Sequence, residues 1–261
     1  MTVADSDLIA AIESTLTFYD PVPGVSEALG IPGLDGRVTV LSDPLANLVT
    51  MARLDERNAD ATIARVKERF GGNAFGWVTG PSTTPRDLPE RLERAGFVVA
   101  ERLAGMALTD LDRPIAAPPV RIDEVAPADA GRESEMMARA YGMPREVNDL
   151  FLRLLGAQRR IRVRGYFAYE DGKPVAWSNL VYVPNTPIVL LGGAATVPEA
   201  RGHGLYTALT KRRLDDARAD GREAAVIQGD RTTSAPICAK LGFRELCALE
   251  FYAWTPEPPK A

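Results

Sequence analysis

The fold of this chain is decided by residues 195–210, which read ATVPEARGHGLYTALT. The stretch begins with small and β-branched residues, which are typical of a strand. A loop that contains Gly202 and Gly204 follows, and it leads directly into a predicted helix. The first turn of a helix carries backbone N–H groups without intrahelical partners, and the macrodipole adds about half a positive charge there. Glycines let a bulky anion approach the backbone, and Arg201 adds a charge. The stretch therefore predicts a phosphate-binding loop.

Two common nucleotide-binding loops do not fit this stretch. A P-loop requires Gly-Lys-Ser/Thr, which the sequence lacks, and the Rossmann fingerprint requires a third glycine where Thr207 stands. The loop also lies late in the chain, after several predicted strands, which is the wrong place for either. An ordinary strand-to-helix turn with chance glycines is the remaining alternative.

The stretch resembles the coenzyme A pyrophosphate loop of the GCN5-related N-acetyltransferase (GNAT) family, whose pattern is Arg/Gln-x-x-Gly-x-Gly/Ala between a strand and a helix. Arg201 and Gly204 match this pattern, whereas Tyr206 stands at its last Gly/Ala position. We expect the Tyr206 side chain to turn away from the phosphates or to reshape that end of the loop. The resemblance implies acetyl-CoA as cosubstrate, contacted by the following residues: Ala195, Thr196, Val197, Arg201, Gly202, His203, Gly204, Leu205, Tyr206 and Thr207.

Composition excludes several other classes of protein. A chain of 261 residues with 46% hydrophobic residues can build one large or two ordinary domains. The formal charge of -4 and the pI of about 5.3 argue against nucleic-acid binding. No apolar run reaches the length of a membrane span, and the first residues lack the basic start of a secretory signal. We therefore expect a cytoplasmic protein with neither nucleic acid nor membrane as partner.

The cysteines and the histidine predict neither a metal site nor a histidine-based triad. Cys238 and Cys247 are the only cysteines and have no partner histidines, so neither a disulfide framework nor a zinc site is expected. His203 is the single histidine and is expected to be an exposed loop residue.

A segment rich in proline and alanine, residues 112–119, divides the chain. We expect a first half at residues 1–113, a linker at 114–119 and a second half at 120–261. The second half predicts strands at 120–125, 161–170, 174–183, 188–197 and 224–228, with a strand pair within 243–254, and helices at 127–141, 145–156, 204–219 and 234–240. This order is that of the GNAT family. The resemblance implies an α/β (α+β) fold in which helices flank a mixed, mostly antiparallel central sheet.

The first half shows a weaker version of the same pattern. Strands are predicted at 47–54, 74–79 and 98–108, and helices at 60–70 and 88–95. Both halves contain a helix end, a Gly-Phe step and a strand start, at Gly96-Phe97 and at Gly242-Phe243. In the first copy the bend at 54–60 has no glycine and brings three acids where phosphates would lie. We interpret it as a degenerate GNAT-like half in a tandem protein, or else as convergence on a common helix stop.

Acetyl transfer to an amine needs a held carbonyl, a free amine lone pair and a proton for the departing thiolate. The resemblance implies that the coenzyme arm lies between the strands at 188–197 and 224–228, near Ala195 and Val197. It also assigns the proton donor to a tyrosine in the pattern Tyr-x-Lys/Arg-x-Gly-Phe, where this chain has Cys238. Cys238 itself can donate a proton, or it is a small core residue. Solvent, Ser234, Tyr252 and Tyr182 are the other candidate donors.

Candidate bases and further coenzyme contacts are less specific. Glu250 and Asp230, at strand ends, can accept a proton, although carboxylates there are usually solvated. Lys211, Arg212 and Arg213 either reach the coenzyme 3′-phosphate or form a solvated helix face balanced by acids. The predicted catalytic residues are Tyr252, Glu250 and Ser234.

The sequence therefore predicts an acetyl-CoA-dependent N-acetyltransferase that acts on a primary amine. The acceptor is a small molecule or a peptide, and the acidic composition leans towards a cationic amine. The alternative is an acyl-CoA-binding sensor without turnover, because Cys238 replaces the usual tyrosine. A third interpretation gives both halves a role in dimerisation only, and a homodimer is compatible with all three.

Overall fold

A computed structural model of the chain describes residues 3–256. The first half contains α1 (Asp5–Ser14), β1 (Glu27–Ala28), β2 (Asp35–Val38), β3 (Leu48–Thr50), α2 (Ala59–Phe70), β4 (Phe75–Thr79), α3 (Leu88–Arg94) and β5 (Val98–Leu108). The second half contains β6 (Arg121–Val125), η1 (Pro127–Glu133), α4 (Ser134–Tyr141), α5 (Arg145–Ala157), β7 (Val163–Glu170), β8 (Lys173–Tyr182), β9 (Ile188–Leu190), β10 (Ala194–Thr196), η2 (Pro198–Ala200), α6 (Leu205–Ala219), β11 (Ala224–Asp230), α7 (Ser234–Lys240) and β12 (Arg244–Trp254).

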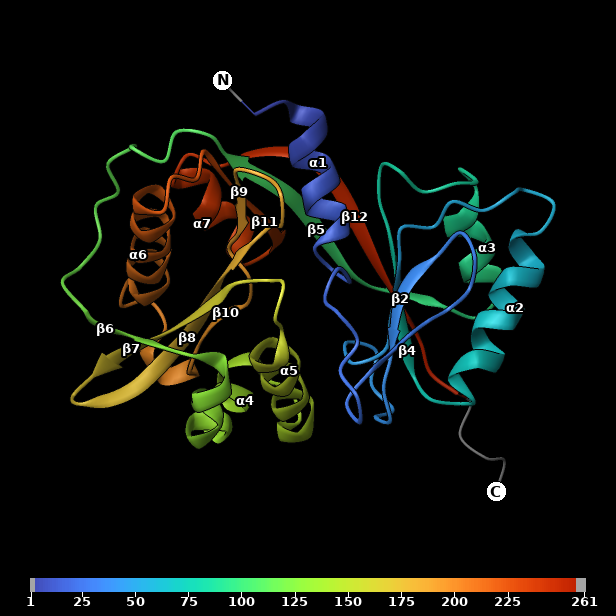
Figure 1. Ribbon diagram of the computed structural model, residues 1–261, viewed down its shortest axis with the longest axis horizontal. Helices are drawn as coiled ribbons and strands as arrows, with labels where there is room; N and C mark the ends of the chain where they lie inside the picture. The colour runs from blue at the N-terminus through green and yellow to red at the C-terminus, as the bar shows by residue number, and fades with distance from the viewer. Residues whose placement is uncertain (1–2, 257–261) are drawn as a thin grey trace.

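One mixed sheet runs through the whole molecule (Figure 1). Its order is β1-β2-β3-β4-β12-β5-β11-β9-β8-β7-β6, and β10 pairs with β8 beside this path. The pairs β3–β4 and β9–β11 are parallel, and the other neighbours are antiparallel. This confirms the predicted α/β fold with a mostly antiparallel sheet flanked by helices.

Four predicted elements differ from the structure. The strand expected at 47–54 is only β3, because Met51 has a positive φ of 53°. The strand pair expected within 243–254 is the single strand β12, which stays extended because β4 and β5 pair along it on both sides. The helix expected at 127–141 divides into η1 and α4, and Gly131 lies in the η1 part. The strand expected at 188–197 breaks between β9 and β10. In addition, α1, β1 and β2 were not predicted.

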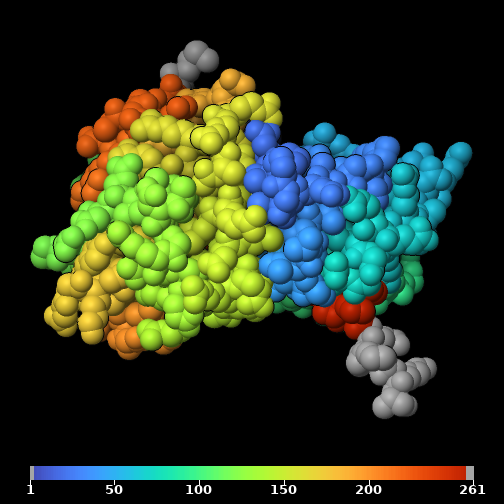
Figure 2. Space-filling view, turned by 60° about the horizontal axis from the view of Figure 1, so that its bottom comes forward, coloured from blue at the N-terminus to red at the C-terminus, as the bar shows by residue number. Residues whose placement is uncertain are grey.

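The two halves exchange strands. β5, from the first half, lies between β11 and β12, and β12, from the second half, lies between β4 and β5. In Figure 1 these two long strands cross the middle of the molecule from one lobe to the other. Figure 2 shows the same exchange at the surface, where the red C-terminal strand emerges beneath the cyan segments of the first half. Each half therefore completes the sheet of the other.

The helix end, Gly-Phe step and strand start that occur in both halves have the same local geometry. Gly96 and Gly242 both have positive φ, 87° and 99°, directly after α3 and α7. The next residue donates back to the helix in each case, from Phe97 N to Leu92 O and from Phe243 N to Cys238 O, both at 3.0 Å. The strands that follow are antiparallel neighbours. Leu92 thus holds in the first half the position that Cys238 holds in the second.

Alternate side chains of the sheet face two layers of helices. On β11, Ala225 and Ile227 join the cluster that contains residues of α6 and α7, whereas Ala224 and Val226 join the cluster that contains residues of α1. A period of two places alternate residues on opposite faces of a sheet. A third cluster joins α2 and α3 to β4 and β12. The helices that follow the predicted loop therefore lie on the face opposite to α1.

Candidate functional site

The sheet opens between β10 and β11. β9 pairs with the start of β11, and Leu191 N donates to Val226 O at 2.9 Å. Beyond this point β10 pairs with β8, whereas β11 pairs with β5 along its opposite edge, from Ala225 to Asp230. Across residues 3–256, no backbone bond joins β10 to β11, so the two strands present facing edges. Strand edges of this kind need hydrogen-bond partners, from water or from a ligand that carries amides.

A buried arginine fills the base of this opening. The Arg213 side chain of α6 is fully buried and donates to Asn179 O and Gly192 O, both at 3.1 Å, and to Leu209 O at 3.2 Å. These carbonyls come from β8, from the break between β9 and β10, and from α6. Burial lowers the pKa of Arg213, because desolvation disfavours the charged form. Arg213 therefore ties β8, the break between β9 and β10, and α6 together through their backbone carbonyls.

The two positions at the break require glycine because other side chains occupy the space that a Cβ would take. A Cβ on Gly192 would lie 2.1 Å from Asn179 Oδ1, and a Cβ on Gly193 would lie 2.6 Å from the Tyr141 hydroxyl. Asn179 Oδ1 and the neighbouring Ser178 Oγ are buried and have no hydrogen-bond partner within the described part of the chain. Each of these two buried oxygens can therefore still accept a hydrogen bond.

The predicted loop leads from β10 through η2 into α6. Gly202 and Gly204 have positive φ, 83° and 81°, and Gly204 is the N-cap of α6. The first backbone bond of the helix runs from Ala208 N to Gly204 O at 3.0 Å. Within residues 3–256, the N–H groups of residues 202–207 donate to no acceptor. A run of free N–H groups at the positive end of a 15-residue helix favours an anion.

Arg201 and His203 hold the two sides of this loop. Arg201 Nε donates to Thr196 O at 3.1 Å, and its Nη2 donates to Ala140 O at 3.3 Å, so the guanidinium ties the loop to β10 and α4. His203 is exposed, and its Nδ1 lies 3.0 Å from Glu170 Oε1 at the end of β7. Both side chains fix the loop and leave its N–H groups free.

Tyr206 points from the first turn of α6 towards α7. Its hydroxyl lies 3.3 Å from Cys238 Sγ. Burial raises the pKa of Tyr206 and that of Cys238, so both groups are protonated at neutral pH. The ring turns into the protein rather than towards the loop N–H groups. Sequence reasoning singled out both residues, but 32 positions separate them and no pattern predicts that they touch.

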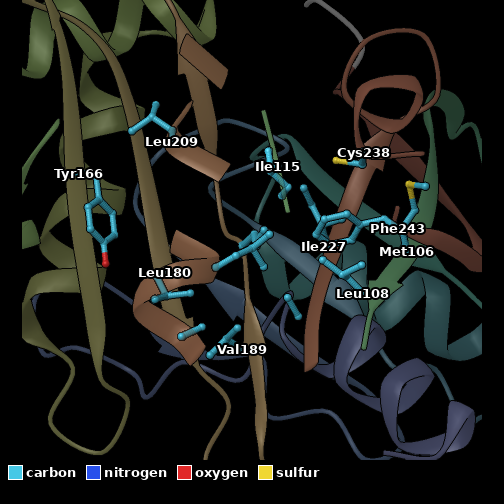
Figure 3. Close-up of a cluster of buried hydrophobic side chains, with 14 of the residues drawn as sticks. Met106, Leu108, Ile115, Tyr166, Leu180, Val189, Leu209, Ile227, Cys238 and Phe243 are labelled. Carbon is cyan, nitrogen blue, oxygen red and sulfur yellow. The ribbon is translucent and has the colours of Figure 1, made fainter. Parts of the chain in front are cut away.

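The segment between the halves lies over the same helices. Ile115 is 9% exposed and belongs to the cluster with Leu205, Leu209 and Cys238. Figure 3 shows Ile115 in the space between Leu209 of α6 and Cys238 of α7. A Cβ on Gly204 would lie 2.8 Å from Pro118 Cγ, which places the segment against the loop as well. Ile115 therefore anchors the predicted linker, whose Pro114, Ala116, Pro118 and Pro119 are exposed.

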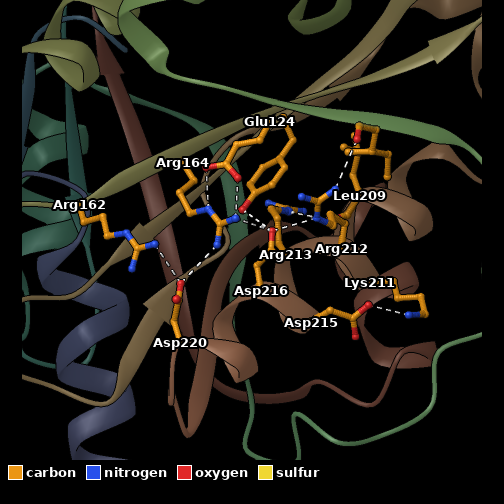
Figure 4. A network of polar contacts seen from close by, with 12 residues as sticks. Glu124, Arg162, Arg164, Leu209, Lys211, Arg212, Arg213, Asp215, Asp216 and Asp220 are labelled. Carbon is orange, nitrogen blue, oxygen red and sulfur yellow. Dashed lines mark hydrogen bonds and ion pairs between the residues drawn. The ribbon is translucent and has the colours of Figure 1, made fainter.

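The basic residues of α6 are divided between two roles. Lys211 pairs with Asp215 at 2.6 Å and Arg212 with Asp216 at 2.9 Å, which matches the predicted solvated face, whereas Arg213 is buried. Arg164 of β7 joins this face by bonding Asp216 at 3.1 Å and Glu124 at 2.8 Å (Figure 4). In the same figure Asp220 faces Arg162 and Arg164. These ion pairs tie α6 to β6 and β7.

The other candidate residues make contacts of their own. Tyr252 is buried in the cluster of α2 and α3, and its hydroxyl donates to Glu250 at 2.7 Å. Glu250 also pairs with Arg102 at 3.1 Å. The Tyr182 hydroxyl donates to Asp220, and Asp230 accepts from the Thr232 and Thr233 backbones at the turn before α7. Ser234 is the first residue of α7.

The equivalent bend of the first half is built differently. Residues 54–60 lead into α2 without a glycine, and Asp60 in the first turn pairs with Arg91 at 2.7 Å. The first turn of α2 thus carries a carboxylate, whereas the first turn of α6 has free N–H groups. Such an end repels a phosphate.

Known proteins of one family share this arrangement of strands, loop and helix. Residues 133–243 match the model of the acetyltransferase (GNAT) family. This segment is a GNAT domain. A GCN5-related N-acetyltransferase from Kribbella flavida superimposes with a TM-score of 0.66 at 16% identity, covering 100% of this chain and 97% of its own.

Two further solved structures share the fold. A tandem GNAT protein from the clavulanic acid biosynthesis pathway has a TM-score of 0.61 at 16% identity, covering 93% of this chain and 86% of its own. A putative acetyltransferase of the GNAT family from Novosphingobium aromaticivorans has a TM-score of 0.57 at 20% identity, covering 88% and 92%. At these identities the likeness establishes the fold. The search of curated proteins found no match.

Among residues 3–256, no helix is both long and apolar enough to cross a membrane. The same residues contain no group of three or more His, Cys, Asp or Glu side chains placed to hold a metal ion.

Proposed function

We propose that this GNAT-domain protein is an acetyl-CoA-dependent N-acetyltransferase that transfers the acetyl group directly to a primary amine. The observation that carries the proposal is the row of free N–H groups at residues 202–207, at the start of α6 and beside the opening between β10 and β11. A pyrophosphate fits the N–H groups, and an amide-bearing arm fits the facing strand edges. GNAT enzymes use acetyl-CoA, which has both parts.

The residues of the second half supply binding and orientation in this proposal. The loop holds the pyrophosphate through its backbone, and Arg201 keeps the loop against β10. Ala195 and its neighbours on β10 align the arm, so that the thioester carbonyl lies where an amine can attack it. Positioning of this kind is a major part of acyl-transfer catalysis.

In this proposal the first half contributes strands to the shared sheet and a surface beside the site, but it does not form a second coenzyme site. Asp60 stands in the first turn of α2, the helix that corresponds to α6, and the bend at residues 54–60 contains no glycine. We propose that this half is a degenerate GNAT-like unit that shapes the acceptor side of the site. The acidic net charge favours a cationic amine as acceptor.

A titration of the whole protein with acetyl-CoA, followed by calorimetry and by thermal shift, tests the coenzyme assignment. We expect saturable binding and a higher melting temperature, because a ligand that binds only the folded state stabilises it. Absence of binding at millimolar acetyl-CoA would exclude the proposal.

A second candidate function, an acyl-CoA sensor without turnover, is favoured by one observation. Cys238 of α7 stands where the family pattern has the tyrosine that protonates the leaving thiolate. Release of free thiol from acetyl-CoA, measured with a panel of polyamines, amino acids, aminoglycosides and peptides, separates the two functions. Turnover with any amine excludes the sensor, and binding without turnover supports it.

A further inference from the structure

A cavity of about 490 Å³ lies where the first half of the chain meets α5 of the second half. Its walls come from the segment that follows α1, from the β1–β2 hairpin and from Leu154 of α5. Gln158 joins the halves there, since it donates to Asp20 O at 3.1 Å and accepts from Asp20 N at 3.0 Å. In Figure 2 the blue segments of the first half adjoin the yellow-green segments of the second. The walls include no residue of the loop at 202–207, so this cavity is separate from the proposed coenzyme site.

Arg37 of β2 lines the cavity as a buried cation without a counter-ion. The residue is 7% exposed, and its guanidinium lies 5.3 Å from the centre of the Phe151 ring. Its Nε donates to Ala46 O at 2.9 Å and its Nη2 to Leu45 O at 2.8 Å. Within residues 3–256, Nη1 has no acceptor and no carboxylate pairs with the guanidinium. Burial of an unpaired charge costs free energy, which a bound anion would recover.

Tyr19 adds a hydroxyl to the same cavity. It follows α1 in the chain, and in the described part of the protein its hydroxyl has no hydrogen-bond partner. Burial raises the pKa of Tyr19 although the Arg37 charge acts in the opposite direction, so the hydroxyl keeps its proton. Burial lowers the pKa of Arg37 to about 10, which leaves the guanidinium charged at neutral pH. The cavity thus offers one cation and one further hydrogen-bond donor.

Three carboxylates also line the cavity and restrict the charge of an anion that can bind. Asp20 and Glu27 are each paired with an arginine. Asp35 lies two residues before Arg37, on the same face of β2, and is exposed. These negative charges repel a dianion more strongly than a monoanion.

Much of the remaining wall is apolar. Leu29, Ile31, Leu34 and Leu154 line the cavity and are buried. Its volume falls within the range of about 300–1,000 Å³ that small-molecule sites have. The walls therefore suit an organic body attached to the anionic group.

We propose that this cavity binds a small organic monocarboxylate, with its carboxylate against Arg37 and the Tyr19 hydroxyl and its apolar body against the leucine and isoleucine side chains. Arg37 belongs to the first half and Leu154 to the second, so the ligand contacts both halves. This site is independent of acyl transfer, and the acetyl-CoA site lies elsewhere in the molecule.

Calorimetric titration of the whole protein with benzoate and with benzamide tests the charge requirement. The two probes are similar in shape and differ in charge. We expect benzoate to bind at least tenfold more tightly, because hydrogen bonds from an arginine to a carboxylate are charge-assisted. Inorganic phosphate at pH 8, where it is a dianion, should bind more weakly than benzoate. Absence of benzoate binding, equal affinities for benzoate and benzamide, or tighter binding of phosphate would overturn the proposal.

The variant Arg37→Gln removes the cation from the cavity. We expect its affinity for benzoate to fall at least tenfold, whereas Arg57→Gln, which removes an exposed charge of the same half, should bind as the wild type does. Because Arg37 also bonds two carbonyls, Tyr19→Phe is a second variant that breaks no hydrogen bond of the folded protein and should weaken benzoate binding severalfold. Wild-type affinity for benzoate in either folded variant would contradict the assignment.

Saturating coenzyme A distinguishes this cavity from the loop at 202–207, which is the other candidate anion site. Benzoate should bind with the same Kd in the presence and absence of coenzyme A. Competition between the two would place the carboxylate at the loop and overturn the inference. A protein that binds benzoate through Arg37 but does not bind acetyl-CoA would support the inference and exclude the proposed function.

Discussion

Among single side chains, Arg201 has the clearest role in holding the loop. Its guanidinium bonds two carbonyls, Thr196 O and Ala140 O, from different elements. Arg201→Glu removes these bonds and places a negative charge beside the free N–H groups. We expect the affinity for acetyl-CoA to fall at least tenfold, because charged hydrogen bonds contribute about 1.5–3 kcal/mol. Calorimetric titration measures the change.

A matched control for Arg201→Glu is the same charge reversal in the other half. Arg69 of α2 is partly exposed and pairs only with the exposed Glu27. Arg69→Glu should therefore bind acetyl-CoA as the wild type does. Equal weakening by both variants would show that net charge, and not the loop, decides the affinity.

The ion pairs that tie α6 to β6 and β7 predict a pH dependence of stability. A hydrogen bond from Tyr182 lowers the pKa of Asp220 below 3.8, and one from Arg164 lowers the pKa of Glu124 below 4.5. Since these pKa values are lower in the folded state, the unfolded state binds more protons in acid. The stabilisation is complete above the ordinary values and is lost as the pH falls through the depressed ones.

The variant Asp220→Asn tests this dependence. We expect urea unfolding to show a shallower loss of stability in acid than the wild type shows, with little difference in slope near neutral pH. Asp112→Asn, which alters an exposed carboxylate bonded to Arg218, is the control and should keep the wild-type slope. A wild-type slope in Asp220→Asn would refute the role of this network.

The segment between the halves is anchored in the core by Ile115. Ile115 is 9% exposed, whereas Val40 is 86% exposed. Ile115→Ala should lower the free energy of unfolding by about 2–5 kcal/mol, the usual range for a buried isoleucine. Val40→Ala should change it by about 0.5 kcal/mol or less. Denaturant titration compares them, and similar small effects would show that the segment is loosely held.

Over the whole molecule, the exchange of β5 and β12 makes the two halves depend on each other. Residues 1–113 alone would lack β12 between β4 and β5, and residues 120–261 alone would lack β5 beside β11. Unpaired strand edges of this kind leave backbone groups without partners and favour aggregation. We expect neither half to unfold cooperatively on its own, as measured by circular dichroism during urea titration.

Co-expression completes this test. The two fragments, produced together, should associate and recover the spectrum of the intact chain, because β5 and β12 would pair again. A cooperative transition in either isolated half would instead show that the halves are independent domains.

How well a feature could be predicted depends on how far apart in the chain its interacting residues lie. Helix ends at Gly96 and Gly242, and the free N–H groups at the start of α6, were predictable because they depend on residues that are neighbours in the chain. The single strand β12 was predicted as a pair because nothing local indicates that β4 and β5 pair along it on both sides. Arg213 was grouped with the partly exposed Lys211 and Arg212 because its acceptors come partly from β8.

The order of elements and the loop at residues 201–207 follow from local sequence, since φ preferences, capping and side-chain periodicity act over a few residues. The tertiary structure alone decided three features: the contact of Tyr206 with Cys238, the packing of Ile115 over α6 and α7, and the exchange of strands between the halves. Each joins residues far apart in the chain. Such contacts depend on which surfaces bury one another, and no short pattern encodes that choice.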